Sequence, residues 1–92
     1  MYMKLVVVYR PKSEHARKLE EFVEDLKTRH ALSEEQIELQ DIDTRQGSAT
    51  AEVYGIMAYP GIIVTDNNGA CIKVWSGELP LQNEIMSYLF TG

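Results

Sequence analysis

The chain has 92 residues, 45% of them hydrophobic, and a formal net charge of −5 at pH 7. This length supports one hydrophobic core but not two, so we expect a single domain over residues 1–92. The acidic balance argues against general binding to nucleic acid or to an anionic membrane, and we expect neither as a partner.

The first predicted elements are a buried strand and a long helix. Residues Met3 to Tyr9 include the apolar run Leu5 to Val8, which predicts a central strand covered on both faces. The run is too short for a signal peptide or a membrane span. Ser13 is a good helix N-cap, and apolar residues then recur at helical spacing as far as Arg29, namely Ala16, Leu19, Phe22, Val23 and Leu26.

A shorter strand and a second helix follow. Apolar residues at Ile37, Leu39 and Ile42 are mixed with polar ones, which is typical of a strand at a sheet edge. Together with the first strand and helix, it predicts a right-handed parallel βαβ unit. We expect residues Asp43 to Gly47 to form a loop, and Ser48 or a neighbour to cap a short helix that continues through Tyr54.

The stretch after this helix predicts a helix end and a second central strand. Gly55 is able to adopt the left-handed conformation that ends a helix. Tyr59 precedes Pro60, which favours an extended conformation, so a strand can begin at Pro60 but cannot run through it. Residues Ile62 to Val64 are consecutive and β-branched, so both faces of this strand should be covered.

The last part of the sequence predicts a hairpin and a closing helix. Residues Asp66 to Gly69 have turn chemistry, and the apolar pattern resumes with Cys71, Ile72, Val74 and Trp75. Gly77 ends this strand, and Pro80 lies at or near the first turn of a helix that carries Leu81, Ile85, Tyr88 and Leu89. The predicted order is therefore βαβαββα.

This order and two sequence stretches resemble the thioredoxin and glutaredoxin superfamily. Ala51-Glu52-Val53-Tyr54-Gly55-Ile56, followed by Pro60 and an apolar strand that ends at Asn68-Gly69, resembles the thioredoxin stretch around its cis-proline. Val8-Tyr9-Arg10-Pro11 resembles the glutaredoxin approach to its active site. The resemblance covers essentially the whole chain. It implies an α/β thioredoxin-like fold, a four-stranded mixed sheet in the order 2-1-3-4 with helices on both faces, and a cis peptide bond between Tyr59 and Pro60.

The redox motif of that superfamily is missing. Its Cys-x-x-Cys lies where the first strand leads into the first helix, and this chain has Ser13-Glu14-His15-Ala16 there. A helix N-terminus favours a cysteine thiolate, but a serine hydroxyl is too weak an acid for the same effect. Dithiol oxidoreductase activity is excluded because the chain has only one cysteine. Gly61 also replaces the small hydroxyl residue that often follows the family proline, so substrate contacts are not implied there.

The remaining reactive side chains have simple structural interpretations. Cys71 is the only cysteine, and such a residue is more often a small buried hydrophobe than a nucleophile. On a regular strand it shares a face with Lys73 and Trp75. Ser13 and His15 do not face each other on a helix, and His15 and His30 are too far apart to share a metal. We therefore expect a reducing, cytoplasmic environment, with no metal and no cofactor.

Two candidate binding surfaces lie near the start of the first helix. Basic residues gather there at Arg10, Lys12, Arg17 and Lys18, close to backbone amides that favour an anion, although a solvated surface is the simpler interpretation. In the thioredoxin fold the cis-proline loop faces the same helix end. The resemblance therefore implies a groove for an extended peptide, lined by Pro11, Ser13, Ala58, Tyr59, Pro60 and Trp75.

Three functional hypotheses follow. The first is a non-redox thioredoxin-like domain, monomeric or weakly homodimeric, that binds a protein or peptide of unknown identity at the cis-proline loop and the N-terminus of the first helix. The second is a monothiol redox protein that acts through Cys71 by forming a mixed disulfide with glutathione or a protein. The third is a KaiB-like regulatory protein, since that thioredoxin-like family also lacks the dithiol.

Overall fold

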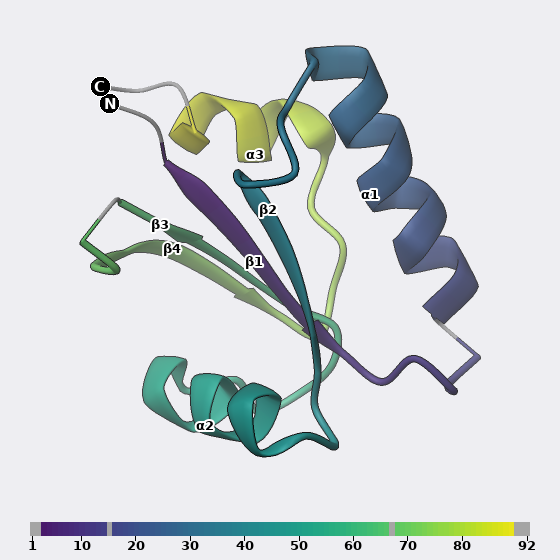
Figure 1. The fold of residues 1–92 in the computed structure, drawn as a ribbon, viewed down its shortest axis with the longest axis vertical. Helices are drawn as coiled ribbons and strands as arrows, with labels where there is room; N and C mark the ends of the chain where they lie inside the picture. Colours follow the sequence, from purple (N-terminus) through teal and green to yellow (C-terminus); the bar gives the residue numbers. More distant parts are fainter. Residues whose placement is uncertain (1–2, 15, 67, 90–92) are drawn as a thin grey trace.

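The computed structural model describes residues 3–14, 16–66 and 68–89. Their sheet is mixed and four-stranded in the order β2-β1-β3-β4, with β1 and β2 parallel and the other two pairs antiparallel (Figure 1). This confirms the predicted element order and the thioredoxin-like fold class. The elements, in chain order, are β1 (Lys4–Tyr9), α1 (Ala16–His30), β2 (Ile37–Asp41), α2 (Arg45–Tyr54), β3 (Gly61–Thr65), β4 (Cys71–Ser76) and α3 (Gln82–Leu89).

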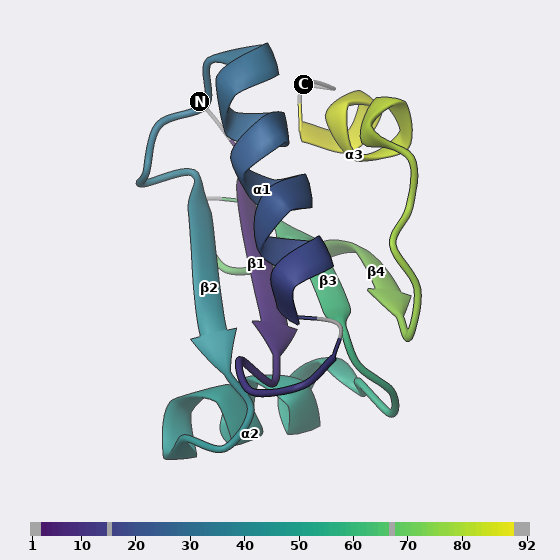
Figure 2. The same cartoon turned by 90° about the vertical axis from the view of Figure 1, so that its right-hand side faces the viewer.

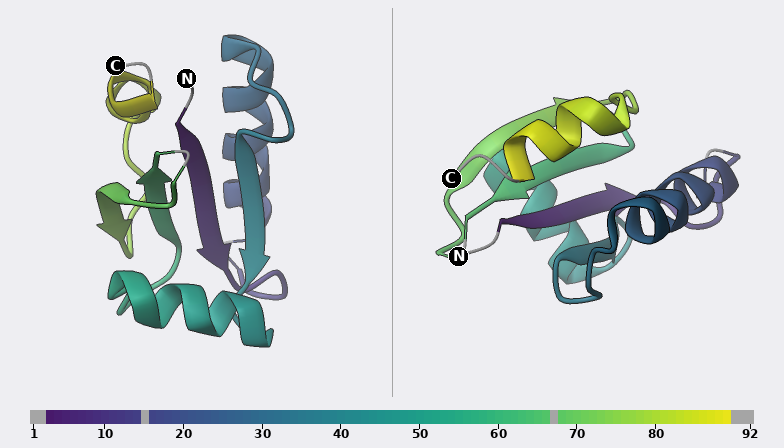
Figure 3. Two further views of the ribbon diagram at one scale, coloured as in Figure 1. Left: turned by 60° about the vertical axis from the view of Figure 1, so that its left-hand side comes forward. Right: turned by 90° about the horizontal axis from the view of Figure 1, so that it is seen from above.

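Helices cover both faces of the sheet. Helices α1 and α3 lie on one face, where Leu5 and Val7 of β1 pack against Leu19 of α1 and Ile85 of α3 in a buried cluster (Figure 2). On the other face α2 lies crosswise to the strands near one end of the sheet (Figure 3). Alternate residues of β1 belong to two different buried clusters, one on each face of the sheet. The uninterrupted apolar run that predicted a central strand is therefore buried on both faces. No helix of the described ranges is long and apolar enough to cross a membrane.

The ends of α2 show one correct and one wrong prediction. Gly55 has a φ of 69°, and its N–H bonds to carbonyl groups of the last turn, as predicted for a residue that ends a helix. The helix begins earlier than expected, however. Thr44 is the N-cap, because its hydroxyl accepts a hydrogen bond of 3.0 Å from the N–H of Gly47. The loop predicted over Asp43 to Gly47 and the cap predicted at Ser48 are therefore wrong.

Ser13 does not cap α1, which begins three residues later at Ala16. The Ser13 hydroxyl instead donates to the carbonyl of Arg10 at 2.7 Å, and the Ser13 N–H donates to the same carbonyl at 3.0 Å. Both bonds close a turn between β1 and α1, so the side chain is engaged before the helix begins. His15 lies outside the described residues. The closing helix α3 likewise begins at Gln82, after Pro80 rather than at it.

The substitution Gly47→Ala should lower the free energy of unfolding. A Cβ at this position would lie 2.0 Å from the carbonyl oxygen of Asp41, so the backbone between β2 and α2 would have to move. Overpacking of this kind costs about 1–3 kcal/mol, which outweighs the helix propensity gained. Urea denaturation followed by circular dichroism measures the change. Ser48→Ala, at the next and exposed position of α2, is the control and should be neutral or slightly stabilising; equal stability of both variants would contradict the packing argument.

Candidate functional site

A cavity of about 210 Å³ lies at the end of the sheet where β1 stops and α1 starts. The loop between α2 and β3, with its cis Tyr59–Pro60 peptide bond, reaches the same end. Leu19 of α1 is buried and forms an apolar wall, whereas the side chain of Tyr59 is 38% exposed. The lining residues are Tyr9, Arg10, Ser13, Leu19, Tyr59 and Pro60.

A second cavity, of about 250 Å³, continues along the other side of the proline loop. It shares Leu19, Tyr59 and Pro60 with the first and is bounded beyond them by Gly77 and the rim residues Lys18, Glu78 and Leu79. Because the two cavities share these three residues, they form one recess on both sides of Tyr59 and Pro60. We call the residues of both cavities the proline-loop groove.

The proline loop is fixed on either side of Tyr59. Ser76 Oγ accepts hydrogen bonds of 3.2 Å from the N–H groups of Met57 and Ala58, and the N–H of Gly77 donates to the carbonyl of Pro60 at 2.9 Å. Among the described residues, none forms a hydrogen bond with the backbone N–H or C=O of Tyr59. The groove therefore presents a backbone donor and a backbone acceptor held in place by their neighbours.

Tyr9, a buried residue of the groove lining, forms a tyrosine–carboxylate pair with the exposed Glu20. The hydroxyl of Tyr9 donates to Glu20 Oε2 at 2.9 Å. Burial raises the pKa of Tyr9 to about 12, and the hydrogen bond to Glu20 and the negative charges of Glu20 and Asp41 act in the same direction. Tyr9 is therefore a neutral phenol near pH 7. Its hydroxyl is engaged with Glu20, so it serves to shape the groove.

The residues predicted for the groove are only partly brought together. Ser13, Tyr59 and Pro60 line the recess, and Ala58 is exposed beside it, anchored through its backbone N–H. Pro11 is exposed and does not line either cavity. Trp75 is only 7% exposed, because its ring packs edge-on against Tyr88 at 5.6 Å between centroids in the core.

Several lining residues were not predicted as groove residues from the sequence. Leu19 belongs to the apolar stripe of the first helix, which indicated burial but not a cavity wall. Tyr9 was expected as the end of a strand and as part of the Val8-Tyr9-Arg10-Pro11 stretch that resembles the glutaredoxin approach to its active site, but not as a groove residue. Gly77 and Leu79 reach the groove through the turn after β4, and no sequence pattern signals that approach.

Gly61, directly after the proline, offers no side chain to the groove. It is buried, and a Cβ built on it would lie 2.6 Å from the side chain of Ile56. The chain is thus closely packed at the position where a hydroxyl residue often stands in relatives of this fold.

The predicted anion patch stays a prediction, and ion pairs offset part of its charge. Arg10 Nε lies 3.5 Å from Asp43 Oδ2, and Arg17 Nε lies 3.6 Å from Glu21 Oε1. Both pairs are solvent-exposed, so each is worth little to stability. Lys12 is exposed on the turn before α1.

Cys71 lies far from the groove and is exposed, so the expectation of a small buried residue is wrong. It pairs with Thr65, at the end of β3 remote from Pro60. The pairing is irregular there, since Val64 pairs with Lys73 and Thr65 with Cys71, which leaves Ile72 as an additional residue. This bulge breaks the alternation that placed Cys71 on the face of Lys73.

Within the described residues, no group of three or more histidine, cysteine or acidic side chains is arranged to hold a metal ion.

Comparison with known proteins shows the fold. No protein-family model matches the chain, and no curated protein matches its sequence. Among solved structures, a thioredoxin from Halobacterium salinarum is 20% identical with a TM-score of 0.70, covering 95% of this chain and 71% of its own. Mitochondrial thioredoxin 3 from Saccharomyces cerevisiae is 11% identical with a TM-score of 0.69, covering 95% and 76% respectively. Thioredoxin 1 from Thermosipho africanus is 15% identical with a TM-score of 0.68, covering 92% of both chains.

The raised pKa of Tyr9 predicts a loss of stability in alkali. Its pKa of about 12 in the folded chain exceeds the ordinary tyrosine value of 10.0, so the folded state holds the phenolic proton more tightly than the unfolded state. This contribution is fully present below pH 10 and is lost as the pH rises toward 12. Urea unfolding at a series of pH values should therefore show a decline in this range that is shallower in Tyr9→Phe. Identical pH slopes for the two proteins would contradict the assigned shift.

Proposed function

We propose that the chain is a cytoplasmic, non-redox thioredoxin-like domain that binds an extended protein or peptide segment in the proline-loop groove. The observation that carries this proposal is the unpaired backbone of Tyr59, which lies between two cavities and is fixed by hydrogen bonds on both sides. An extended segment can pair with such a backbone as an added strand would, through its own N–H and C=O groups.

The side chains of the groove suit an apolar or aromatic anchor on that segment. Leu19 supplies a buried wall, and the exposed side chains of Tyr59 and Leu79 stand at the edges. Tyrosine is common in binding sites because its ring contributes apolar area while its hydroxyl remains able to form hydrogen bonds. Backbone pairing would give affinity, and the two cavities would select the flanking side chains.

The chemistry of the groove supports binding rather than thiol exchange. Ser13 stands beside Tyr59 and Pro60, and its hydroxyl already donates to the carbonyl of Arg10. No cysteine lines either cavity, since Cys71 belongs to the remote end of β4. The groove therefore has the shape for recognition without a nucleophile that the fold could activate.

The monothiol hypothesis remains the second candidate, because Cys71 is exposed and thus meets the access requirement for a mixed disulfide. Its distance from the groove separates any thiol chemistry from the proposed recognition surface. The KaiB-like regulatory hypothesis rests only on the shared absence of a dithiol, and no feature of the described residues adds to it.

The substitution Tyr59→Ala should weaken peptide binding at least tenfold. Peptides selected from a random phage-displayed library on the wild-type protein provide the ligand, and fluorescence polarisation gives the dissociation constant. Loss of the ring removes an exposed contact and leaves Ser76 and Gly77 to hold the loop, so the circular dichroism spectrum should be unchanged.

Val53→Ala is the matched control for this experiment. Val53 is 76% exposed on α2, on the other side of the sheet from α1, and truncating it should leave peptide affinity unchanged. Unchanged affinity in Tyr59→Ala, or an equal loss in both variants, would overturn the assigned surface.

Cys71 should react rapidly with a thiol reagent in the folded protein, since its side chain is exposed at the start of β4. Absorbance after addition of an aromatic disulfide at neutral pH follows the reaction, and the denatured protein gives the reference rate. We expect a native rate within about tenfold of the denatured rate. Peptide affinity should survive Cys71→Ser, whereas loss of peptide binding in that variant would favour the monothiol hypothesis over recognition at the groove.

A further inference from the structure

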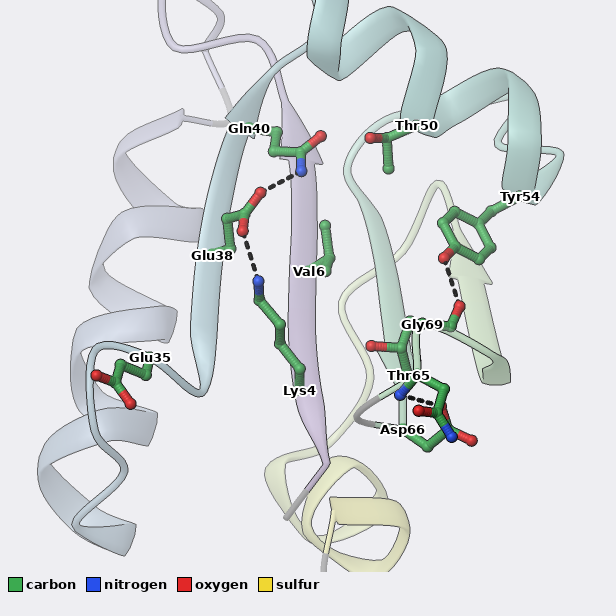
Figure 4. Close-up of a pocket in the computed structure, with 11 residues that line it drawn as sticks. Lys4, Val6, Glu35, Glu38, Gln40, Thr50, Tyr54, Thr65, Asp66 and Gly69 are labelled. Carbon is green, nitrogen blue, oxygen red and sulfur yellow. Dashed lines mark hydrogen bonds and ion pairs between the residues drawn. The ribbon is translucent and has the colours of Figure 1, made fainter. Parts of the chain in front are cut away.

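The opposite face of the sheet has a cavity of about 660 Å³ beside α2, which we call the α2-side cavity. It exists because α2 lies crosswise and covers only one end of this face (Figure 3). Figure 4 shows polar side chains from β1, β2, β3 and α2 around it. The residues that matter for its chemistry are Lys4, Glu38, Gln40, Thr50, Tyr54 and Thr65.

Gln40 places an unsatisfied acceptor at this cavity. Its side chain is buried, with a residue exposure of 9%, and Nε2 donates to Glu38 Oε2. Its other polar atom, Oε1, is buried without a hydrogen-bond partner among the described residues. Turning the amide around would bring Oε1 against the carboxylate of Glu38, so the bond to Glu38 fixes the orientation. In Figure 4 this oxygen and the hydroxyl of Thr50 point toward one another from facing walls.

A buried acceptor without a partner is costly and rare. A donor group on a molecule between Gln40 and Thr50 would satisfy it. The cavity is not enclosed, so such a molecule can enter it.

The charges at the centre of the cavity cancel. Lys4 Nζ donates to Glu38 Oε1 at 2.7 Å, and this bond, followed by the one from Gln40, lowers the pKa of Glu38. Glu38 is therefore ionised near pH 7 and paired with Lys4, while Glu35 and Asp66 add negative charge to the lining, which disfavours an anionic ligand. Lys4 has further N–H donors, and Glu38 has further acceptor sites. The carboxylate of Asp66 is engaged by the backbone N–H groups of Asn68 and Ala70.

The cavity also has apolar walls. Val6 lies on the sheet beneath it, and the ring of Tyr54 stands at the α2 side, held by a hydrogen bond of 2.9 Å from its hydroxyl to the carbonyl of Gly69. Thr65 is 3% exposed and adds a hydroxyl on β3. These apolar walls are the smaller part of a mainly polar lining, and the volume lies within the range of about 300–1,000 Å³ that is usual for small-molecule sites.

We propose that the α2-side cavity binds a neutral, hydroxyl-rich small molecule of the size of a monosaccharide or disaccharide. Each hydroxyl both donates and accepts, so one group can donate to Gln40 Oε1 while another accepts from Lys4. An anion would be repelled by the acidic side chains of the lining, and a bare cation has no acceptor for the N–H donors of Lys4. This site is separate from the proline-loop groove and does not depend on peptide binding there.

Titration of the ¹⁵N-labelled protein tests the proposal through amide chemical shifts. The probes are glucose, xylose, maltose and myo-inositol, with glucosamine and gluconate as matched charged analogues. We expect saturable shifts at Gln40, Thr50 and Thr65 with at least one neutral probe, and binding at least fivefold weaker for gluconate, the anionic analogue. Absence of saturable shifts for all four neutral probes would overturn the proposal, as would tighter binding of a charged analogue. If the cavity holds only water, none of the four neutral probes will give saturable shifts.

Two substitutions identify the groups responsible. Gln40→Met keeps the length of the side chain but removes the carbonyl oxygen, and Thr50→Val keeps the shape but removes the hydroxyl. Each should weaken sugar binding at least fivefold. The control Val53→Ala, on the same helix as Thr50, should bind sugar as tightly as the wild-type protein. If Gln40→Met disturbs the amide spectrum as a whole, Thr50→Val decides the outcome. Full binding in Thr50→Val would then refute the site, and peptide binding at the groove should be unaffected in either variant.

Discussion

The structure depends on the burial of β1 and β3 on both faces. Their antiparallel register pairs Val7 with Ile62 and Val8 with Gly61, so the carboxyl end of β1 lies directly beside the start of β3. The turn that follows Tyr9 and the loop that ends at Pro60 must therefore meet at one end of the sheet. The position of the proline-loop groove is thus a consequence of how the two central strands pair.

The same sheet presents two faces of different character, because one has two helices and the other has one. Helices α1 and α3 cover the first face with a continuous apolar cluster. Helix α2 covers part of the second face, where Val8, Ile63 and Ala51 are packed together. Beyond this cluster the sheet carries Lys4, Glu38 and Gln40, which satisfy one another incompletely. Polar residues on an incompletely covered face can remain hydrated or bind a ligand. This distinguishes the face beside α2 from the apolar face that α1 and α3 cover.

The sequence predicted the fold because its strongest signals are local and agree with one another. The apolar runs at Leu5 and Ile62, the helix end at Gly55 and the turn at Gly69 each determine a nearby backbone conformation, and together they leave few topologies. The errors involve contacts that local patterns do not encode. Thr44 caps α2 because of the path that the backbone takes between β2 and α2. The irregular pairing at Thr65 changes which residues of β4 lie on the same face as Cys71. Trp75 was expected in the groove, yet its packing with Tyr88 of the last helix buries it.

The absence of a dithiol does not affect the contacts that form the groove. Ser76 and Gly77 hold the loop through hydrogen bonds to its backbone, and Leu19 forms the apolar wall from within α1. None of these contacts involves a thiol. The Ser13 side chain makes its own bond within the turn before α1, so the position is accommodated without cysteine chemistry. A recess built on backbone bonds and core packing keeps its shape whatever side chain stands at its edge, and this is the physical basis on which we propose recognition at this end of the sheet.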